Sequence, residues 1–217
     1  MLPPTHRPRA FTLIEMLVVM AVIAVLAAIL LNLNGLVQSK AARTRATGEI
    51  HALSAGCESY KADNGSYPQD AKTDALDPRA SGNPADYKAA SLYLYKQLSG
   101  DLNADGRNDP NATPPESKNY VPDYFTPQRL GVAPSPAVAG TPNWVLYLKD
   151  PYGNSYGYST KGAAAEQQYR ADVIKDPTKT RPTGQGFNPT FDLWSTSNKA
   201  TNPSADPTVV NVWTKNW

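Results

Sequence analysis

RPRAFTLIEMLVVMAVIAVLAAILLNL, residues 7–33, is the segment around which the rest of the chain is organised. It begins with a short basic leader, continues with Phe11, and is then almost wholly apolar apart from one carboxylate, Glu15. As a helix, residues 13–33 would be roughly 32 Å long at about 1.5 Å per residue, which is close to the ~30 Å of a bilayer core. A carboxylate in such a run costs about 2.5–3.5 kcal/mol on insertion scales, so Glu15 requires an explanation.

Three interpretations of this run compete. In each of them Arg7 and Arg9, which have no acid near them, place the N-terminus on the cytoplasmic side of a membrane. A removable secretory signal peptide would have an apolar region of about 7–15 residues, and this one is longer. A plain single-pass anchor explains the length but leaves Glu15 unexplained. The third interpretation gives the acid a role, and it rests on a resemblance.

Residues 10–17, AFTLIEML, resemble the processing signal of type IV pilins and pseudopilins. In that family a small residue, usually Gly, precedes Phe-Thr-Leu-Ile-Glu and an apolar run, and a prepilin peptidase cuts before the Phe and methylates the new amine. The resemblance therefore implies cleavage between Ala10 and Phe11 and N-methylation of Phe11, with Ala10 departing from the usual Gly. It also implies an assembly role for Glu15, whose carboxylate would meet the N-terminal amine of a neighbouring subunit and set the register of a filament.

The composition argues against several classes of function. Without Arg7 and Arg9, Lys+Arg falls from 21 to 19 against 19 Asp+Glu, so the processed chain is formally neutral and has no electrostatic footprint for nucleic acid. The single cysteine, Cys57, excludes an intramolecular disulfide and is expected to be a small buried hydrophobe. Outside the leader there is one histidine, His51, and no phosphate-binding glycine loop, so no enzyme is indicated.

A second apolar stripe continues the helix beyond residue 33. Its members recur at alternating spacings of three and four, as on one face of a helix: Ala42, Ala46, Ile50, Leu53, Cys57 and Tyr60. Charged residues, among them Glu49, are expected to lie mostly off this stripe. Asn64-Gly65 then supplies a left-handed stop. We therefore expect one helix over about residues 12–63, with residues 11–35 as its transmembrane and assembly half and residues 36–63 packed on a head.

Residues 64–217 are expected to form that head, a globular domain in the periplasm. A second helix is predicted over residues 86–98, with Gly100 as its stop. The Pro-rich residues 110–142 are predicted to be loop, with one turn or short strand at residues 120–125.

Four strands are predicted in the C-terminal part of the head. Residues 144–148 and 155–159 flank the turn DPYGN, residues 150–154, and are expected to pair as a hairpin. Residues 191–195 and 209–213 are the third and fourth strands. Between the second and third strands, residues 162–176 are expected to be a short helix or an insertion.

Three segments of this part carry a second resemblance. Residues 148–156, LKDPYGNSY, resemble the strand, turn and strand of the major pseudopilins of type II secretion, residues 191–195 resemble a later strand, and Asn216-Trp217 resembles the terminal Asn-Trp. Residues 70–142 match that family poorly. The resemblance implies an α+β, pilin-like fold, in which a long N-terminal helix carries a small C-terminal antiparallel β-sheet head.

Residues 101–109, DLNADGRND, match most of an EF-hand-type calcium loop. Side-chain oxygens fall at the first, third, fifth and ninth places, in Asp101, Asn103, Asp105 and Asp109. Gly106 permits the sharp turn, and Arg107 offers its carbonyl at the seventh place. The twelfth place is Ala112 instead of a bidentate Glu, although Glu116 could fold back to serve. The alternative is a solvated turn.

The resemblance adds another candidate for calcium. Pseudopilins bind calcium in a loop between their last strands, which corresponds here to about residues 195–206. Asp206 is the only acid in that loop. At either place we expect a weak site of the extracellular class.

Together these features imply a structural protein and not an enzyme. The resemblance implies a subunit of a type II secretion pseudopilus, held by a single pass in the inner membrane with its head in the periplasm. Its partners would be other copies of itself, prepilin peptidase, other pseudopilins, the inner-membrane assembly platform and the lipid bilayer. The alternative is a type IV pilus pilin for adhesion, motility or DNA uptake. A membrane-anchored envelope enzyme or sugar-binding domain is a third hypothesis, and no acid pair or metal cluster supports an enzyme.

Overall fold

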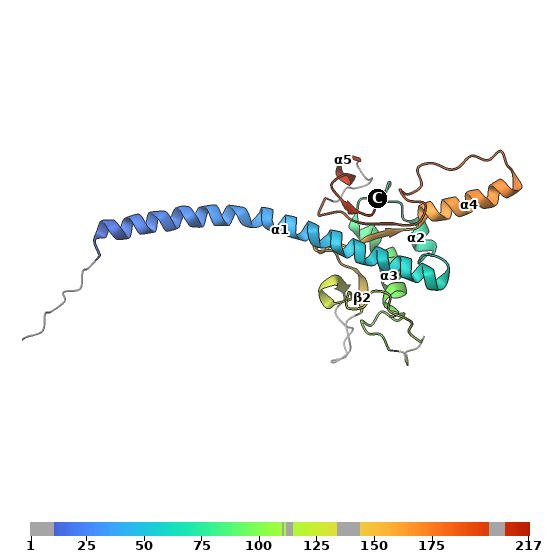
Figure 1. Ribbon diagram of the computed structural model, residues 1–217, viewed down its shortest axis with the longest axis horizontal. Coiled ribbons are helices and arrows are strands. Elements are labelled where there is room, and N and C mark those ends of the chain that lie inside the picture. The colour runs from blue at the N-terminus through green and yellow to red at the C-terminus, as the bar shows by residue number, and fades with distance from the viewer. Residues whose placement is uncertain (1–10, 110, 112–114, 134–143, 200–206) are drawn as a thin grey trace, which may run out of the picture. The chain divides into compact units, whose positions relative to one another are not determined.

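The computed structural model describes the chain except for residues 1–10, 110, 112–114, 134–143 and 200–206 (Figure 1). The chain divides into two compact units, Met1–Ala41 and Ala42–Trp217. The predicted leader, with Ala10 at its end, lies outside the described residues.

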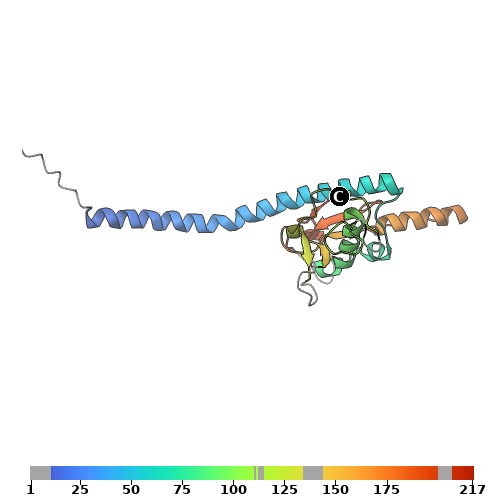
Figure 2. The ribbon, with the colours of Figure 1, turned by 90° about the horizontal axis from the view of Figure 1, so that it is seen from below.

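The first helix, α1, spans Leu13–Asn64, within one residue of the predicted bounds at each end (Figures 1 and 2). In the first unit, all the side chains described from residue 11 to residue 28 are exposed, and most of them are apolar. Among the helices of the described residues, none is both long enough and apolar enough to cross a membrane.

The predicted stripe on α1 is buried in the second unit. Ala46, Leu53 and Cys57 are fully buried, and Ile50 is nearly so. The helix ends as the sequence predicts, because Gly65 adopts φ +78° and its N–H donates to the Lys61 carbonyl at 2.8 Å.

Three short helical segments follow α1. The helix α2 (Ala71–Ala75), which was not predicted, begins with a capping box between Asp70 and Thr73. The predicted second helix is confirmed, as the 3₁₀ turn η1 (Pro84–Tyr87) followed by α3 (Lys88–Ser99). Gly100 ends α3 with φ +80°, as predicted.

The described strands form two antiparallel sheets. One sheet pairs β1 (Leu130–Val132), which follows the 3₁₀ turn η2 (Pro127–Arg129), with β2 (Val145–Leu148). The other has the order β3-β4-β5 and consists of β3 (Gly157–Ser159), β4 (Asp192–Ser195) and β5 (Thr214–Lys215). The helix α4 (Lys161–Lys175) lies between β3 and β4 in the chain, and α5 (Pro207–Val210) precedes β5. The α+β prediction is confirmed.

The predicted Pro-rich loop is partly structured. A turn does occupy residues 121–124, inside the predicted segment, but β1 was not predicted. Residues 134–143 of this region lie outside the described part of the chain.

The predicted hairpin of residues 144–148 and 155–159 forms only next to its turn, where the Tyr156 N–H donates to the Leu148 carbonyl at 2.9 Å. The first of these segments contains β2, which pairs with β1, and the second contains β3, which pairs with β4. One isolated bridge, Lys149 to Ser155, joins them. The turn between them is instead organised by Asp150, whose buried carboxylate accepts the N–H groups of Tyr152 and Asn154 at 3.0 and 2.8 Å. Alternation in a sequence predicts a strand but does not name its partner.

The predicted fourth strand, residues 209–213, is wrong. Val209 and Val210 are the last two residues of α5. The chain then turns through a hydrogen bond from the Val212 N–H to the Val209 carbonyl at 3.0 Å. The strand is β5, which begins after Trp213. Trp213 is nearly fully buried and stacks on Trp194 with ring centroids 6.4 Å apart, so its packing has outweighed the strand propensity of the valines.

Two clusters of buried side chains hold the second unit together. The larger joins α1 and α3 to the strands and includes Leu53, Leu94, Leu148 and Leu193. The smaller gathers aromatic side chains of β4 and the C-terminal segment with Tyr87. Most of α4 projects from this core (Figures 1 and 2), and its Ile174 is 85% exposed.

Candidate cation site

The loop of residues 101–116 begins at the C-terminal end of α3. Gly100 donates its N–H to the Lys96 carbonyl at 3.1 Å and turns the chain with a positive φ. A Cβ at Gly100 would lie 2.1 Å from the Ser117 carbonyl oxygen, so only glycine lets the end of the loop pass this close to its start. The Asn108 side chain closes the same crossing by donating to the carbonyls of Ser99 and Ser117 at 2.8 and 2.9 Å.

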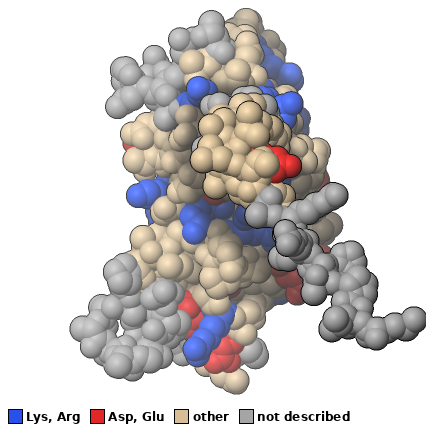
Figure 3. Space-filling view, turned by 90° about the vertical axis from the view of Figure 1, so that its left-hand side faces the viewer, with Lys and Arg blue, Asp and Glu red and all other residues tan. Residues whose placement is uncertain are grey.

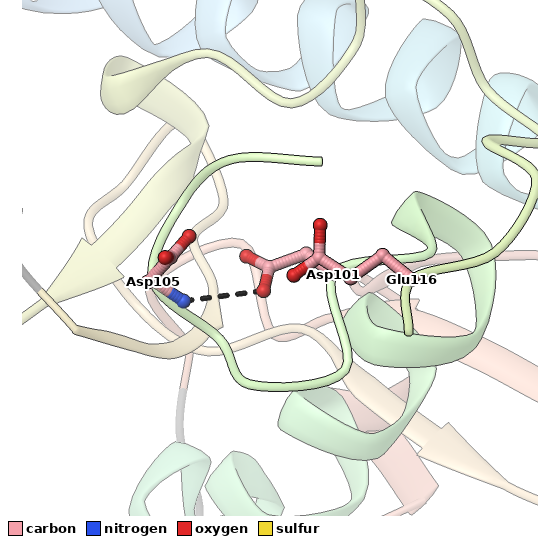
Figure 4. A group of neighbouring side chains, drawn as sticks. All are labelled: Asp101, Asp105 and Glu116. Atoms are coloured by element: carbon pink, nitrogen blue, oxygen red, sulfur yellow. Dashed lines mark hydrogen bonds between the residues drawn. The ribbon is translucent and has the colours of Figure 1, made fainter. Parts of the chain in front are cut away.

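Three acidic side chains of this loop converge (Figure 4). Asp101, Asp105 and Glu116 each place one carboxylate oxygen within 4.8 Å of the others. We call these three residues the acidic group.

Asp101 organises the first half of the loop. Its side chain is only 1% exposed, and its Oδ2 accepts the Tyr95 hydroxyl at 2.5 Å and the Gly106 N–H at 2.8 Å. Its Oδ1 accepts the Asp105 N–H at 3.2 Å, the contact dashed in Figure 4. These contacts wrap the backbone of residues 101–106 around one carboxylate.

Asp105 and Asn103 complete this half. Asp105 Oδ1 accepts the Arg107 N–H at 2.9 Å, and Asn103 Oδ1 accepts the Asp105 N–H at 2.9 Å. The Asn103 side-chain nitrogen lies 3.4 Å from Asp105 Oδ2. Such turns of Asp and Asn hold both side chains close to their own backbone.

Glu116 returns to the loop from beyond the predicted twelfth place. Its Oε2 accepts the Asp109 N–H, whereas its Oε1 is buried and has no hydrogen-bond partner among the residues that the structure describes. Burial raises the pKa of Glu116, and the negative charges of Asp101, Asp105 and Asp109 raise it further against the opposing hydrogen bond from Asp109.

The structure brings together only some of the sequence-predicted ligands. Asp101 and Asp105 belong to the acidic group, and Glu116, the fold-back candidate, joins them. Asn103 and Arg107 hydrogen-bond within the loop. Asp109 does not belong to the group, and its Oδ1 accepts the Asn111 N–H at 2.9 Å. Asp206 lies outside the described residues.

The donor set of the acidic group fits a hard divalent cation. Calcium prefers carboxylate and carbonyl oxygens, and three carboxylates meet here. Two unit charges 4.8 Å apart repel by roughly 3 kcal/mol at an effective dielectric constant of about 20. Within the described ranges no Lys or Arg side chain forms an ion pair with any of the three acids. A bound cation would remove that repulsion and give the buried Glu116 oxygen a partner.

A second site of interest is the start of α1. One oxygen of Glu15 accepts both the N–H and the hydroxyl of Thr12, at 2.7 and 2.8 Å, and the Glu15 N–H donates back to that hydroxyl at 3.3 Å. This reciprocal arrangement is a capping box. It engages one carboxylate oxygen, Oε2, and it makes Glu15 a cap for its own helix. The predicted pairing with another subunit stays a prediction.

Glu49 is a buried charge that was not predicted from the sequence. It is 3% exposed and accepts from Arg45 Nε at 2.8 Å, Arg129 Nε at 3.2 Å and the Tyr156 hydroxyl at 2.8 Å. Only Arg45, one helical turn earlier, was a local signal. Arg129 and Tyr156 lie 80 and 107 residues away in the chain, where no spacing rule applies.

Charged side chains of both signs lie on the face of the molecule drawn in Figure 3. Basic and acidic side chains are interspersed there among uncharged ones, without one continuous basic field.

Comparisons with known proteins agree with the sequence-based resemblance. Residues 5–31 match the family described as the prokaryotic N-terminal methylation motif. Type II secretion system core protein G of Pectobacterium carotovorum subsp. carotovorum is 36% identical over 88 residues, which cover 39% of this chain and 56% of that protein. The matched part of the chain therefore spans about half the length of this curated relative. No solved structure matches the chain.

Proposed function

The N-terminal methylation motif and the similarity to a type II secretion core protein support membership of this chain in the type IV pilin and pseudopilin superfamily, and on that premise we propose that it is a structural subunit of a type II secretion pseudopilus. Both matches support the more general role of a pseudopilin or a type IV pilin. The choice of secretion rests on the one relative and on the turn at residues 150–154. Both matches point to a structural protein and not to an enzyme.

In this proposal prepilin peptidase cuts between Ala10 and Phe11 and methylates Phe11. The apolar start of α1 holds the subunit in the inner membrane, with the residues after it in the periplasm. Subunits then leave the bilayer for a filament in which α1 packs against other copies. The exposed apolar side chains of residues 11–28 support this, because such a surface requires lipid or protein to cover it.

Mass spectrometry of the purified protein tests the processing step. We expect a chain that begins with N-methyl-Phe11. A chain that begins at Met1, or one that begins after about residue 30, would contradict the pilin assignment.

Glu15 is the residue on which assembly would depend, since it is the acid of the apolar run. Glu15→Val should leave membrane insertion intact and reduce filament formation. Glu15→Gln is the matched variant, because it keeps an acceptor for the Thr12 N–H but loses the charge. Assembly lost in both variants supports charge pairing between subunits, whereas rescue by Gln would leave only the helix cap as the role of Glu15.

We also propose that the acidic group binds calcium. The unpartnered, buried Oε1 of Glu116 beside two other carboxylates carries this proposal. Calorimetry of the full chain in detergent should detect the heat of calcium binding. Glu116→Gln should weaken the calcium affinity roughly tenfold or more. Asp172→Asn, which removes an equal charge from α4, is the control and should bind like the wild type. The absence of heat from the wild type would refute the site.

A further inference from the structure

The helix α4 leaves the core of the second unit together with the segment that returns along it. We call residues 161–186 the arm. Its base is tightly packed, because Gly162 is buried and a Cβ there would lie 2.1 Å from the Asn188 carbonyl oxygen. Farther out, none of the side chains of residues 170–175 is buried, and Ile174 is 85% exposed. The outer part of the arm is therefore an uncovered helix surface, whose aliphatic side chain would gain free energy from burial against a partner.

The arm carries more positive than negative charge. It has five basic and three acidic residues, a formal charge of +2. Near its base the charges are paired, since Glu166 meets Arg170 at 2.9 Å and Arg181 at 3.2 Å. The two outer acids accept hydrogen bonds from neighbours within the arm. Lys175 and Lys179, by contrast, form no ion pair with any residue that the structure describes.

The segment between α3 and η2 has the opposite charge. We call residues 101–126 the connection. It has five acidic and two basic residues, a formal charge of −3. The acids are Asp101, Asp105, Asp109, Glu116 and Asp123. Within the described part of the chain none of them forms an ion pair, whereas the basic Lys118 is already paired with Asp63 at 2.6 Å. In Figure 1 the connection (green to yellow) and α4 (orange) lie on opposite sides of the end of α1.

We infer that, in the filament, the arm of one copy lies against the connection of the next copy. This inference rests on the proposed function, because it requires a filament built from copies of this chain. The two surfaces carry charge of opposite sign and lie on different sides of one copy, so both can be occupied at once. A contact between unlike surfaces leaves one of each free at the ends of an assembly, so it can repeat and build an open helical filament. Charge would also select the surfaces that meet, because two arms or two connections repel each other.

Cross-linking between two variants tests this contact. Ala171→Cys places a thiol on the exposed outer part of α4, and Asn111→Cys places one on the exposed connection. The native Cys57 is fully buried and should add no background. Both variants are produced in the same cells, and their filaments are treated with a short bifunctional maleimide. Chelator is present, so that the proposed calcium site does not alter the charge of the connection.

We expect cross-linked dimers that contain one copy of each variant. Such dimers should be roughly tenfold scarcer when either variant is produced alone, because the contact joins unlike surfaces. Filaments that give no mixed dimer would overturn the inference and leave the proposed function standing. Dimers of the Ala171→Cys variant alone, or a cross-link from residue 171 only to another protein, would overturn it in the same way. If the wild-type chain forms no filament, the proposed function and this inference fail together.

Charge reversal tests the electrostatic part of the contact. Lys175→Glu, added to the Ala171→Cys chain, should lower the yield of mixed dimers roughly threefold or more, since like charges then face each other. Asp109→Lys in the other chain should restore the yield. Lys88→Glu, an equal change of charge on an exposed residue of α3, is the control and should leave the yield unchanged. A loss that Asp109→Lys does not restore, or an equal loss in the control, would contradict the pairing of these two surfaces.

Discussion

At the scale of single residues, the second unit depends on buried carboxylates that each accept several hydrogen bonds. Glu49 meets two arginines and a tyrosine, Asp150 closes a turn, and Asp192 holds the backbone of residues 187–188. A buried acid is tolerated only when donors surround it. Two of the three partners of Glu49, Arg129 and Tyr156, lie far away in the chain, so this acid appears in the sequence as an ordinary surface residue.

Replacing Glu49 should therefore cost more than replacing an exposed acid of the same helix. Glu49→Gln should lower the free energy of unfolding by about 2 kcal/mol, because Arg45 and Arg129 lose a charged acceptor. The more exposed Glu58 provides the control, and Glu58→Gln should change it by about 0.5 kcal/mol or less. Urea denaturation measures both. Equal effects would show that the buried cluster contributes nothing specific.

Asp192 should give the head a pH-dependent stability. Burial raises its pKa to about 6, against two backbone N–H donors and Arg79, which lower it, while Asp77 adds to the rise. Between pH about 4 and about 6 the unfolded chain ionises this carboxyl more readily than the folded chain, so stability falls as pH rises through that window. The loss is at most about 3 kcal/mol. In Asp192→Asn, denaturation curves at several pH values should lack this fall, although the variant is less stable throughout.

At the scale of elements, helices were predicted better than strand pairings. The ends of α1 and α3 are set by Gly65 and Gly100, which act through local backbone geometry. Strand pairing depends on distant segments, so β2 was paired with β3 instead of β1, and residues 209–213 were taken as a strand. The short α2 was missed because five residues show no helical period.

The glycine at the end of α3 provides a test at this scale. Gly100→Ala should destabilise the protein by about 1–3 kcal/mol, because φ +80° is strained for alanine and its Cβ would meet the Ser117 carbonyl. Gly48→Ala is the matched substitution inside α1, where nothing lies within 4 Å of the added Cβ. It should stabilise the helix by up to about 1 kcal/mol. Thermal unfolding should shift in opposite directions, and a shift in the same direction would contradict the assigned cap.

At the scale of the whole molecule, the two units carry different parts of the proposed function. The processing motif and Glu15 belong to Met1–Ala41, and the acidic group belongs to Ala42–Trp217. The motif could be read from sequence because its residues are consecutive. Two of the three members of the acidic group could also be predicted, since the spacing of Asp101 and Asp105 is local. The place of Glu116 could not be fixed, because it depends on how the loop folds back past Gly100.

The burial of Cys57 gives this protein a reporter of its own opening. It is the single cysteine of the chain, its side chain is fully buried on α1, and burial raises the pKa of its thiol. Thiol reagents attack the exposed thiolate, so alkylation should occur only in molecules whose core has opened. Labelling over time, read by mass, should therefore be slow in the folded protein and fast in urea. Rapid labelling of the folded protein would contradict this burial. In filaments, the same measurement would count the subunits whose heads have opened, with no introduced probe.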